Sequence, residues 1–313
     1  MKTIPLSGML GILLTLCLHA APAYAIPETW VASNGAGAAC TRAAPCLTFA
    51  AAHTATDPGG TIKCADAGNF GVVTITKSLT IDCTGTNGGI VNTAGNAVVV
   101  NGANVAVTLR GLSIDGAGTA SIGVGLINGR SLHVENCAIG RHNAGNGAGI
   151  QFNPTGAAEL FVTDSTISEN GVGIFGGGIL IQPNGSGSAL VALNRVTVNR
   201  NSDGIVANGL NTTGAIVMEV RDSSVARNTG TGIFTLTDAS RAGIVIDRST
   251  STLNGGGISV SGANALVHLG NSAVRGNNVG LSAVGGGQIL SYQNNQLDGN
   301  GVEGAPTGVL TLK

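Results

Sequence analysis

The sequence has few charged and few aromatic residues. Of the 313 residues, 10% are charged and 3% are aromatic, and the formal net charge is −1 at pH 7. After the first residues the only lysines are Lys63, Lys77 and Lys313, so the chain has no basic stripe and we expect no nucleic-acid partner. The 43% of apolar residues argues against disorder, and the 51 glycines keep no strict three-residue period, which excludes collagen.

Long apolar runs are missing everywhere except at the start of the chain. Lys2 precedes an apolar run at residues 9–18, and Ala23-Tyr24-Ala25 has the small residues of a cleavage site. We therefore predict a signal peptide over residues 1–25 and a protein that is secreted or periplasmic. Cys17 also permits a lipoprotein, although the leucine before it is bulky for that processing site. No later run approaches the ~20 residues that cross a bilayer, so no membrane span is expected.

One unit recurs along the chain. Residues 160–174 read LFVTDSTISENGVGI, with alternating apolar residues, a closing Asn and then Gly-Ile. The same frame places the closing Asn at six positions, with spacings of 31, 27, 26, 23 and 23 residues: Asn170, Asn201, Asn228, Asn254, Asn277 and Asn300. A looser copy precedes them, with His142 at the Asn position. Periods in this range are typical of solenoids.

The repeat predicts the fold. Two-residue alternation indicates β-strands, and units too small to bury their apolar face alone must stack. We therefore predict an all-β protein, a right-handed parallel β-helix over residues 61–313 with roughly ten coils. The repeated Asn is expected to hold a positive φ at one corner and to hydrogen-bond to the Asn of the next coil, forming a ladder. A β-sandwich is the alternative, but it has no reason to keep Asn and Gly-Ile in phase.

Residues 26–60 are predicted to form an N-terminal cap. Pro45 can start a short helix, and Asp57-Pro58-Gly59-Gly60 stops it. Such a helix would cover the open end of the first coil, whose apolar interior and strand edges would otherwise meet water.

The mature chain has five cysteines, and an exported protein can keep disulfides. Cys40 is expected to pair with Cys46 because the two are close in sequence. Cys64 is expected to pair with Cys83, because in-phase residues of neighbouring strands lie ~4.8 Å apart. Cys137 is left over, and we expect a small buried residue there that is not a nucleophile.

Three segments near the start of the chain are distinctive: residues 45–52 read PCLTFAAA, residues 59–62 read GGTI, and residues 75–81 read ITKSLTI. Together with the Asn-x-x-Gly-Ile coils, they resemble secreted right-handed parallel β-helix repeat proteins of the pectate-lyase-like superfamily. The resemblance covers nearly all of the mature chain. It implies the fold strongly and an activity weakly, because the superfamily includes lyases, hydrolases, epimerases, tailspikes and chains with no assigned activity.

The sequence lacks the residue patterns that such activities need. Pectate lyases of this fold resemble one another in a cluster of acidic calcium ligands, but here no two carboxylates stack in adjacent coils on the outward positions of the first strand. The polygalacturonase motifs are absent, and no two histidines fall at ligand spacing on one element. We therefore predict no metal and no cofactor, and the absent motifs favour a protein that is not an enzyme.

One surface is predicted to bind a ligand. The residue after Gly-Ile should point outward, and in three consecutive coils it is Phe175, Val206 and Phe234. Rings two coils apart, at ~9.6 Å, suit stacking on sugars. We therefore expect an exported, non-enzymatic protein that binds an extended polysaccharide or a surface partner; a polysaccharide lyase or hydrolase acting on acidic polysaccharide is the alternative. Loops folded over the patch would hide it, and Gly178-Ile179 offers a competing anchor that would displace Phe175.

Opposite charges alternate at two corners of the predicted coil. Asp164, Arg195, Asp222 and Arg248 share one register in four consecutive coils, and Arg141, Glu169 and Arg200 share another. We expect each Arg to bridge the acids above and below it and thereby to fix the coil register. The chain ends on residues 309–312 with no helix behind them, so this edge is either bare or paired in an oligomer.

Overall fold

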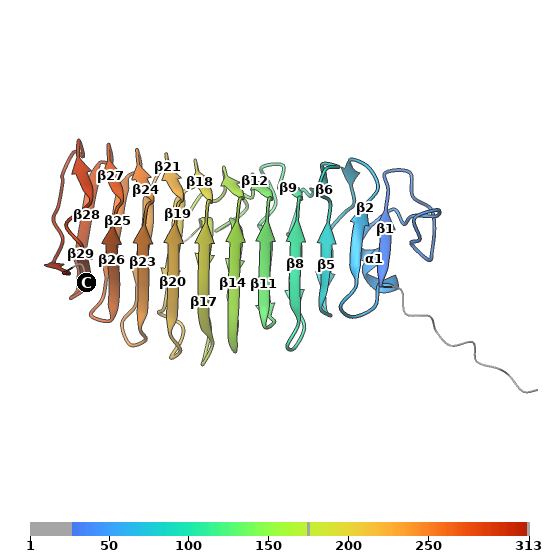
Figure 1. The fold of residues 1–313 in the computed structure, drawn as a ribbon, viewed down its shortest axis with the longest axis horizontal. Helices are drawn as coiled ribbons and strands as arrows, with labels where there is room; N and C mark the ends of the chain where they lie inside the picture. Colours follow the sequence, from blue (N-terminus) through green and yellow to red (C-terminus); the bar gives the residue numbers. More distant parts are fainter. Residues whose placement is uncertain (1–26, 174–175, 312–313) are drawn as a thin grey trace, which may run out of the picture.

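The computed structural model describes residues 27–173 and 176–311, and in them the chain winds into a coil with three parallel sheets (Figure 1). The predicted signal peptide, residues 1–25, lies outside the described residues. Sheets A, B and C have 12, 10 and 9 strands. Nine coils with strands in all three sheets are close to the roughly ten expected.

The strands of sheet A are β1 (Glu28–Val31), β2 (Thr61–Cys64), β5 (Leu79–Asp82), β8 (Ala106–Arg110), β11 (Ser131–Glu135), β14 (Ala157–Thr163), β17 (Ser188–Asn194), β20 (Ile216–Arg221), β23 (Ala242–Asp247), β26 (Ala265–Gly270), β29 (Gln288–Ser291) and β31 (Gly308–Val309).

The strands of sheet B are β3 (Gly68–Asn69), β6 (Gly88–Val91), β9 (Ser113–Asp115), β12 (Ala138–Gly140), β15 (Thr166–Ser168), β18 (Thr197–Asn199), β21 (Ser224–Ala226), β24 (Thr250–Thr252), β27 (Ala273–Arg275) and β30 (Gln296–Asp298). Those of sheet C are β4 (Val73–Ile75), β7 (Asn96–Asn101), β10 (Ile122–Asn128), β13 (Ala148–Phe152), β16 (Gly177–Ile181), β19 (Asp203–Asn208), β22 (Thr231–Leu236), β25 (Gly256–Ser261) and β28 (Val279–Val284).

The alternation of apolar residues places one side chain in two inside the coil. In the coil of β14, β15 and β16, the side chains of Leu160, Val162, Ile167, Ile179 and Ile181 are buried. Each stacks on the same position of its neighbours, as Val162 does on Val134 and Leu193. One continuous core therefore runs the length of the molecule.

The Asn side chains form a ladder inside one corner. The backbone N–H and the Nδ2 of Asn170 both donate to Oδ1 of Asn201, each at 3.0 Å. The same pair of bonds repeats from Asn201 to Asn228, Asn228 to Asn254, Asn254 to Asn277, and Asn277 to Asn300. All but the last of these side chains are buried, so the ladder satisfies backbone and amide groups that water does not reach.

The positive φ at this corner belongs to the residue before the Asn, and the expectation that the Asn itself holds it is wrong. Glu169, Arg200, Arg227 and Leu253 have φ between 54° and 61°. The reason is that the left-handed residue turns the chain, and the next residue can then point its amide inward to the ladder. The second corner is built in the same way, with Asp164, Arg195, Asp222 and Arg248 at positive φ.

Buried serines form a second ladder at that corner. Ser223 N–H donates to Ser249 Oγ and Ser249 N–H to Ser272 Oγ, each at 3.1 Å. Further down, Cys137 N–H donates to Ser165 Oγ at 3.1 Å. The sequence signal for this ladder is a serine directly after most left-handed residues of this corner, with Cys137 and Val196 at two of the other positions.

The short helix α1 (Phe49–Ala55) lies at the N-terminal end of the coil, as the sequence predicts (Figure 1). Its N-cap is Thr48, whose Oγ1 accepts from the N–H of Ala51 at 3.2 Å. The ring of Phe49 packs against Phe70 with 5.2 Å between centroids, which closes the apolar interior. Strand β1, inside the segment predicted as the cap, continues sheet A by pairing with β2.

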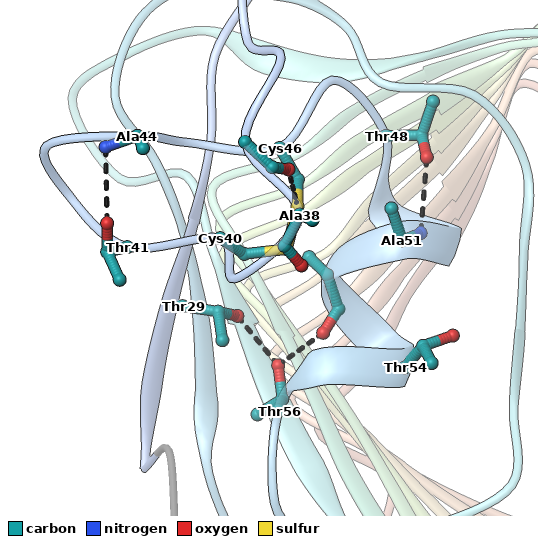
Figure 2. The surroundings of a disulfide bond; sticks show 12 residues. Thr29, Ala38, Cys40, Thr41, Ala44, Cys46, Thr48, Ala51, Thr54 and Thr56 are labelled. Atoms are coloured by element: carbon teal, nitrogen blue, oxygen red, sulfur yellow. Dashed lines mark hydrogen bonds between the residues drawn. A yellow bond between two sulfur atoms is a disulfide. The ribbon is translucent and has the colours of Figure 1, made fainter.

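Both predicted disulfides are present. Cys40 pairs with Cys46 beside α1, where Thr29 and Thr56 also share a hydrogen bond (Figure 2). Cys64 pairs with Cys83 across adjacent coils, with 4.8 Å between their Cα atoms. Cys137 is free and buried, and burial raises the pKa of its thiol to about 11, so the thiol stays protonated at neutral pH. Among the described residues, no helix is long and apolar enough to cross a membrane.

Candidate functional site

The predicted ligand-binding surface is a row of side chains at equivalent positions of successive coils, which we call the file, and it lies on the outer side of sheet C. Val206 pairs with Phe234, and Phe234 with Ser259, as expected from the repeat. The position below Val206 is held by Leu180, because Gly178-Ile179 is the anchor that joins sheet C in this coil. Phe175 lies outside the described residues.

The apolar part of this file is not an exposed patch. Val206 is 2% exposed and packs in a small hydrophobic cluster outside the coil, formed by Ile122, Ala148, Leu180, Val206 and Leu236 with Phe234 against it. The expectation of an exposed Val206 is therefore wrong. The physical reason is that several outward positions of neighbouring strands are apolar, and such side chains pack together rather than face water.

Phe234 borders an open hollow where β19 and β22 begin. This hollow has a volume of about 490 Å³, and we name it the Phe234 hollow; it is lined by Val172, Gly173, Ser202, Asp203, Thr229, Gly230, Thr231 and Phe234. The Phe234 side chain is half-buried: it packs on the small cluster and also lines the hollow. Phe234 therefore contributes one aromatic ring to a concave surface that is lined by both polar and apolar groups.

The polar groups of the hollow are held by backbone contacts. Asp203 Oδ1 accepts from the N–H of Thr231 at 2.8 Å, which ties the two coils together. The hydroxyl of Ser202 donates to the Gly176 carbonyl at 2.6 Å, and that of Thr229 to the Ser202 carbonyl at 3.3 Å. These residues were not among the predicted site residues. Their sequence signal is position, since Ser202 and Thr229 each follow a ladder Asn.

The outer face of sheet A has a second hollow, of about 410 Å³, lined by Arg130, Ala157, Ala158, Glu159, Ser188, Ala189, Leu190, Ala215 and Val217. On the same face, His133 of β11 and Phe161 of the neighbouring β14 stack with ring centroids 4.6 Å apart. Each ring covers one face of the other. This surface is more apolar than the Phe234 hollow and offers fewer groups to hydroxyls.

The charged residues at the second corner, where the serine ladder lies, pair with one another along the stack of coils. Arg195 makes two hydrogen bonds to Asp164, at 2.6 and 2.8 Å, and Arg248 makes two to Asp222, at 2.8 and 3.0 Å. These hydrogen bonds lower the pKa of both carboxyls. Each of these Arg residues thus forms an ion pair with the acid of the preceding coil. The expected second ion pair, between Arg195 and Asp222 of the following coil, is not formed among the described residues.

Histidine, cysteine and carboxylate side chains do not gather into a metal site in the described part of the chain: no group of three such residues lies close enough to hold an ion. His142 is buried, where its N–H and Nδ1 both face Asn170 Oδ1 at the start of the ladder. His133 is stacked on Phe161. In the Phe234 hollow, Asp203 is the one acid among the lining residues.

Comparison with known proteins bears on the fold. The family model described as "Right handed beta helix region" matches residues 96–302. The chain is similar to the crystal structure of pectate lyase Pel9A, with 17% identity, a TM-score of 0.59, and coverage of 90% of this chain and 79% of that one. It also matches the A-module of the Azotobacter vinelandii mannuronan C-5 epimerase AlgE4, with 11% identity, a TM-score of 0.41, and coverage of 82% and 91%. None of the curated proteins compared with the sequence matches it.

Proposed function

Because this chain belongs to the right-handed β-helix family, we propose that it is an exported scaffold that binds a polysaccharide in the Phe234 hollow. The observation that carries the proposal is the composition of the hollow, in which one aromatic ring stands beside a carboxylate and three hydroxyl-bearing side chains. A sugar ring has an apolar C–H face that stacks on aromatics and a rim of hydroxyls that needs hydrogen-bond partners.

The rest of the molecule supports an extended ligand and export. Coils repeat every ~4.8 Å, so neighbouring units present similar groups to successive parts of a polymer. The two disulfides favour an oxidising compartment, which agrees with the predicted signal peptide. A solved structure of similar fold is described as a pectate lyase, so this fold is compatible with a carbohydrate polymer.

The test is Phe234→Ala on a glycan array, followed by titration with the polymer that binds best. Losing a stacking contact of about 1 kcal/mol should weaken binding roughly fivefold. Phe161→Ala is the matched control, because Phe161 is also a half-buried phenylalanine but lies on sheet A. An equal loss of affinity in both variants, or no loss in Phe234→Ala, would show that the polymer does not bind in the Phe234 hollow.

Two further variants refine the site. Asp203→Asn keeps an oxygen for the Thr231 N–H but removes the negative charge, so we expect weaker binding of neutral sugars with little change in stability. Phe175→Ala tests the remaining predicted residue, which lies outside the described part of the chain. An assay for unsaturated uronate release with calcium runs in parallel, and turnover of any polymer would replace the binding proposal with a lyase.

A further inference from the structure

The charge pattern at the Asn corner breaks at one place. Below the break, each Arg has an acid from the coil before it: Arg141 pairs with Asp115, and Arg200 Nε lies 3.2 Å from Glu169 Oε1. Arg227 holds the next position, directly above Arg200, where continued alternation would require an acid. Two arginines therefore follow each other in one file.

The two arginines are held close by the backbone. Arg200 N–H donates to the Ala226 carbonyl and Arg227 N–H to the Thr252 carbonyl, at 3.2 and 3.1 Å, so they occupy one register in consecutive coils, ~4.8 Å apart. Both side chains are exposed. Like charges at directly opposite positions of neighbouring strands are destabilising. This pair therefore carries a cost that the rest of the file avoids.

No acid from above relieves the pair. The residue that follows Arg227 in the file is Leu253, which is 55% exposed. The guanidinium of Arg227 has no hydrogen bond or ion pair with any residue of 27–173 or 176–311. All five of its N–H donors are thus available.

The pair borders a hollow of its own. It has a volume of about 230 Å³ and is lined by Asn199, Arg200, Ala226, Arg227, Thr252 and Leu253. Thr252 adds a hydroxyl that can donate to an oxyanion. The hollow beside Arg200 and Arg227 lies on the sheet B side of the Asn ladder, whereas the Phe234 hollow lies on the sheet C side of the ladder.

We propose that Arg200 and Arg227 form an anion-binding site for a carboxylate or sulfate group. A bound oxyanion would stand between the two guanidiniums, where it takes the place of the missing acid in the alternating file. Guanidinium groups match carboxylates and sulfates through paired hydrogen bonds. The proposal does not depend on the Phe234 hollow, because neither Arg200 nor Arg227 lines the Phe234 hollow.

The experiment titrates the full chain with sodium sulfate and, separately, with sodium malonate, while sodium chloride keeps the ionic strength constant. Amide NMR signals of Ala226 and Thr252, which line the hollow, are the readout. Arg227→Gln should weaken binding at least fivefold, and Arg227→Lys should weaken it less because the charge remains. The control is Arg241→Gln, which removes an exposed arginine that also lacks a partner in the described chain.

Arg227→Glu separates a binding role from a structural one. It restores alternation, with Arg200 between two acids, so we expect a higher melting temperature together with loss of the anion-induced shifts. Saturable shifts with either anion support the site, and the tighter ion identifies the ligand as carboxylate or sulfate. Wild-type affinity in Arg227→Gln would overturn the proposal, and so would an equal loss in Arg241→Gln, which would indicate a diffuse field.

Discussion

His142 takes the position that Asn holds in later coils, and it should make stability depend on pH. Its Nδ1 donates to Asn170 Oδ1, so Nε2 is left as a buried acceptor with no partner among the described residues. Burial lowers the pKa of His142, against a smaller raising effect from the Asn170 hydrogen bond. The neutral ring is therefore favoured in the folded state, and its stabilisation is complete above the unfolded pKa of about 6.5.

We expect the melting temperature to fall as the pH drops below that value toward the folded pKa. At about pH 5.5 the loss is at most about 1.4 kcal/mol. His142→Asn should flatten the dependence between about pH 7.5 and 5.5, because an amide does not titrate there. His268→Asn, which changes a half-buried histidine on sheet A, is the control. A pH dependence that survives in His142→Asn would assign it to another group.

Single residues also mark the limit of the sequence prediction. The repeat fixed the corner at the Asn, but it could not tell which of two adjacent residues turns the chain, since Asn tolerates a positive φ and also makes ladders. The structure assigns the turn to Glu169, Arg200, Arg227 and Leu253, residue types that seldom adopt it. Their sequence signal is weak, although Gly276 and Gly299 continue the same file.

At the scale of the element, the Asn ladder should carry more stability than the exposed ion pairs. Asn228 is 1% exposed, accepts two bonds from Asn201 and donates two to Asn254. Asn228→Ala would remove the acceptor of two buried bonds, from the backbone N–H and the Nδ2 of Asn201, which should cost about 2–4 kcal/mol. Asn300→Ala, at the half-buried end of the ladder, should cost about 1 kcal/mol. Urea unfolding of both variants tests the order, which equal losses would contradict.

The ion pairs show why pattern alone overstates a contact. The repeat correctly predicted that Asp164, Arg195, Asp222 and Arg248 share one register. It also suggested, wrongly, that each Arg bridges the acids of both neighbouring coils. Arg195 makes both of its bonds to Asp164, and Arg248 makes two to Asp222 and one to Asp247, its neighbour in sequence, so neither Arg bridges two acids of the predicted register. Both pairs are exposed, and such pairs add only ~0–1 kcal/mol to stability.

At the scale of the molecule, the parallel coil, its hand, the capping helix and both disulfides follow from period, alternation and cysteine register. The ligand-binding surface could be predicted from the sequence only in part: the alignment of Val206 with Phe234 was correct, but the exposure of Val206 was not. Residues 173–179 contain Gly-Ile twice, and the sequence could not decide which copy joins sheet C. The choice of Gly178-Ile179 puts Leu180 in the file, and the burial of Val206 then depends on outward side chains of several coils, which no single repeat reveals.

Stability should also be distributed unevenly along the coil. At one end, α1 and the Cys64–Cys83 disulfide close the interior. In the last described coils, the core residues Leu269, Val274 and Leu281 border a hollow of about 180 Å³, beside the half-buried Leu297. Coils of a solenoid contact only their neighbours, so a coil with an incomplete neighbour opens at lower cost.

We therefore expect amide hydrogen exchange to be fastest in β29, β30 and β31 and slowest in β14, β15 and β16, with a graded change between them. Reducing the disulfides should speed exchange in β2 and β5 and leave the last coils unchanged, because the effect passes only through adjacent coils. Uniform protection along the chain would mean that the coil opens as one unit. Protection of β29 to β31 that rises with protein concentration would show instead that these strands pair with a second copy.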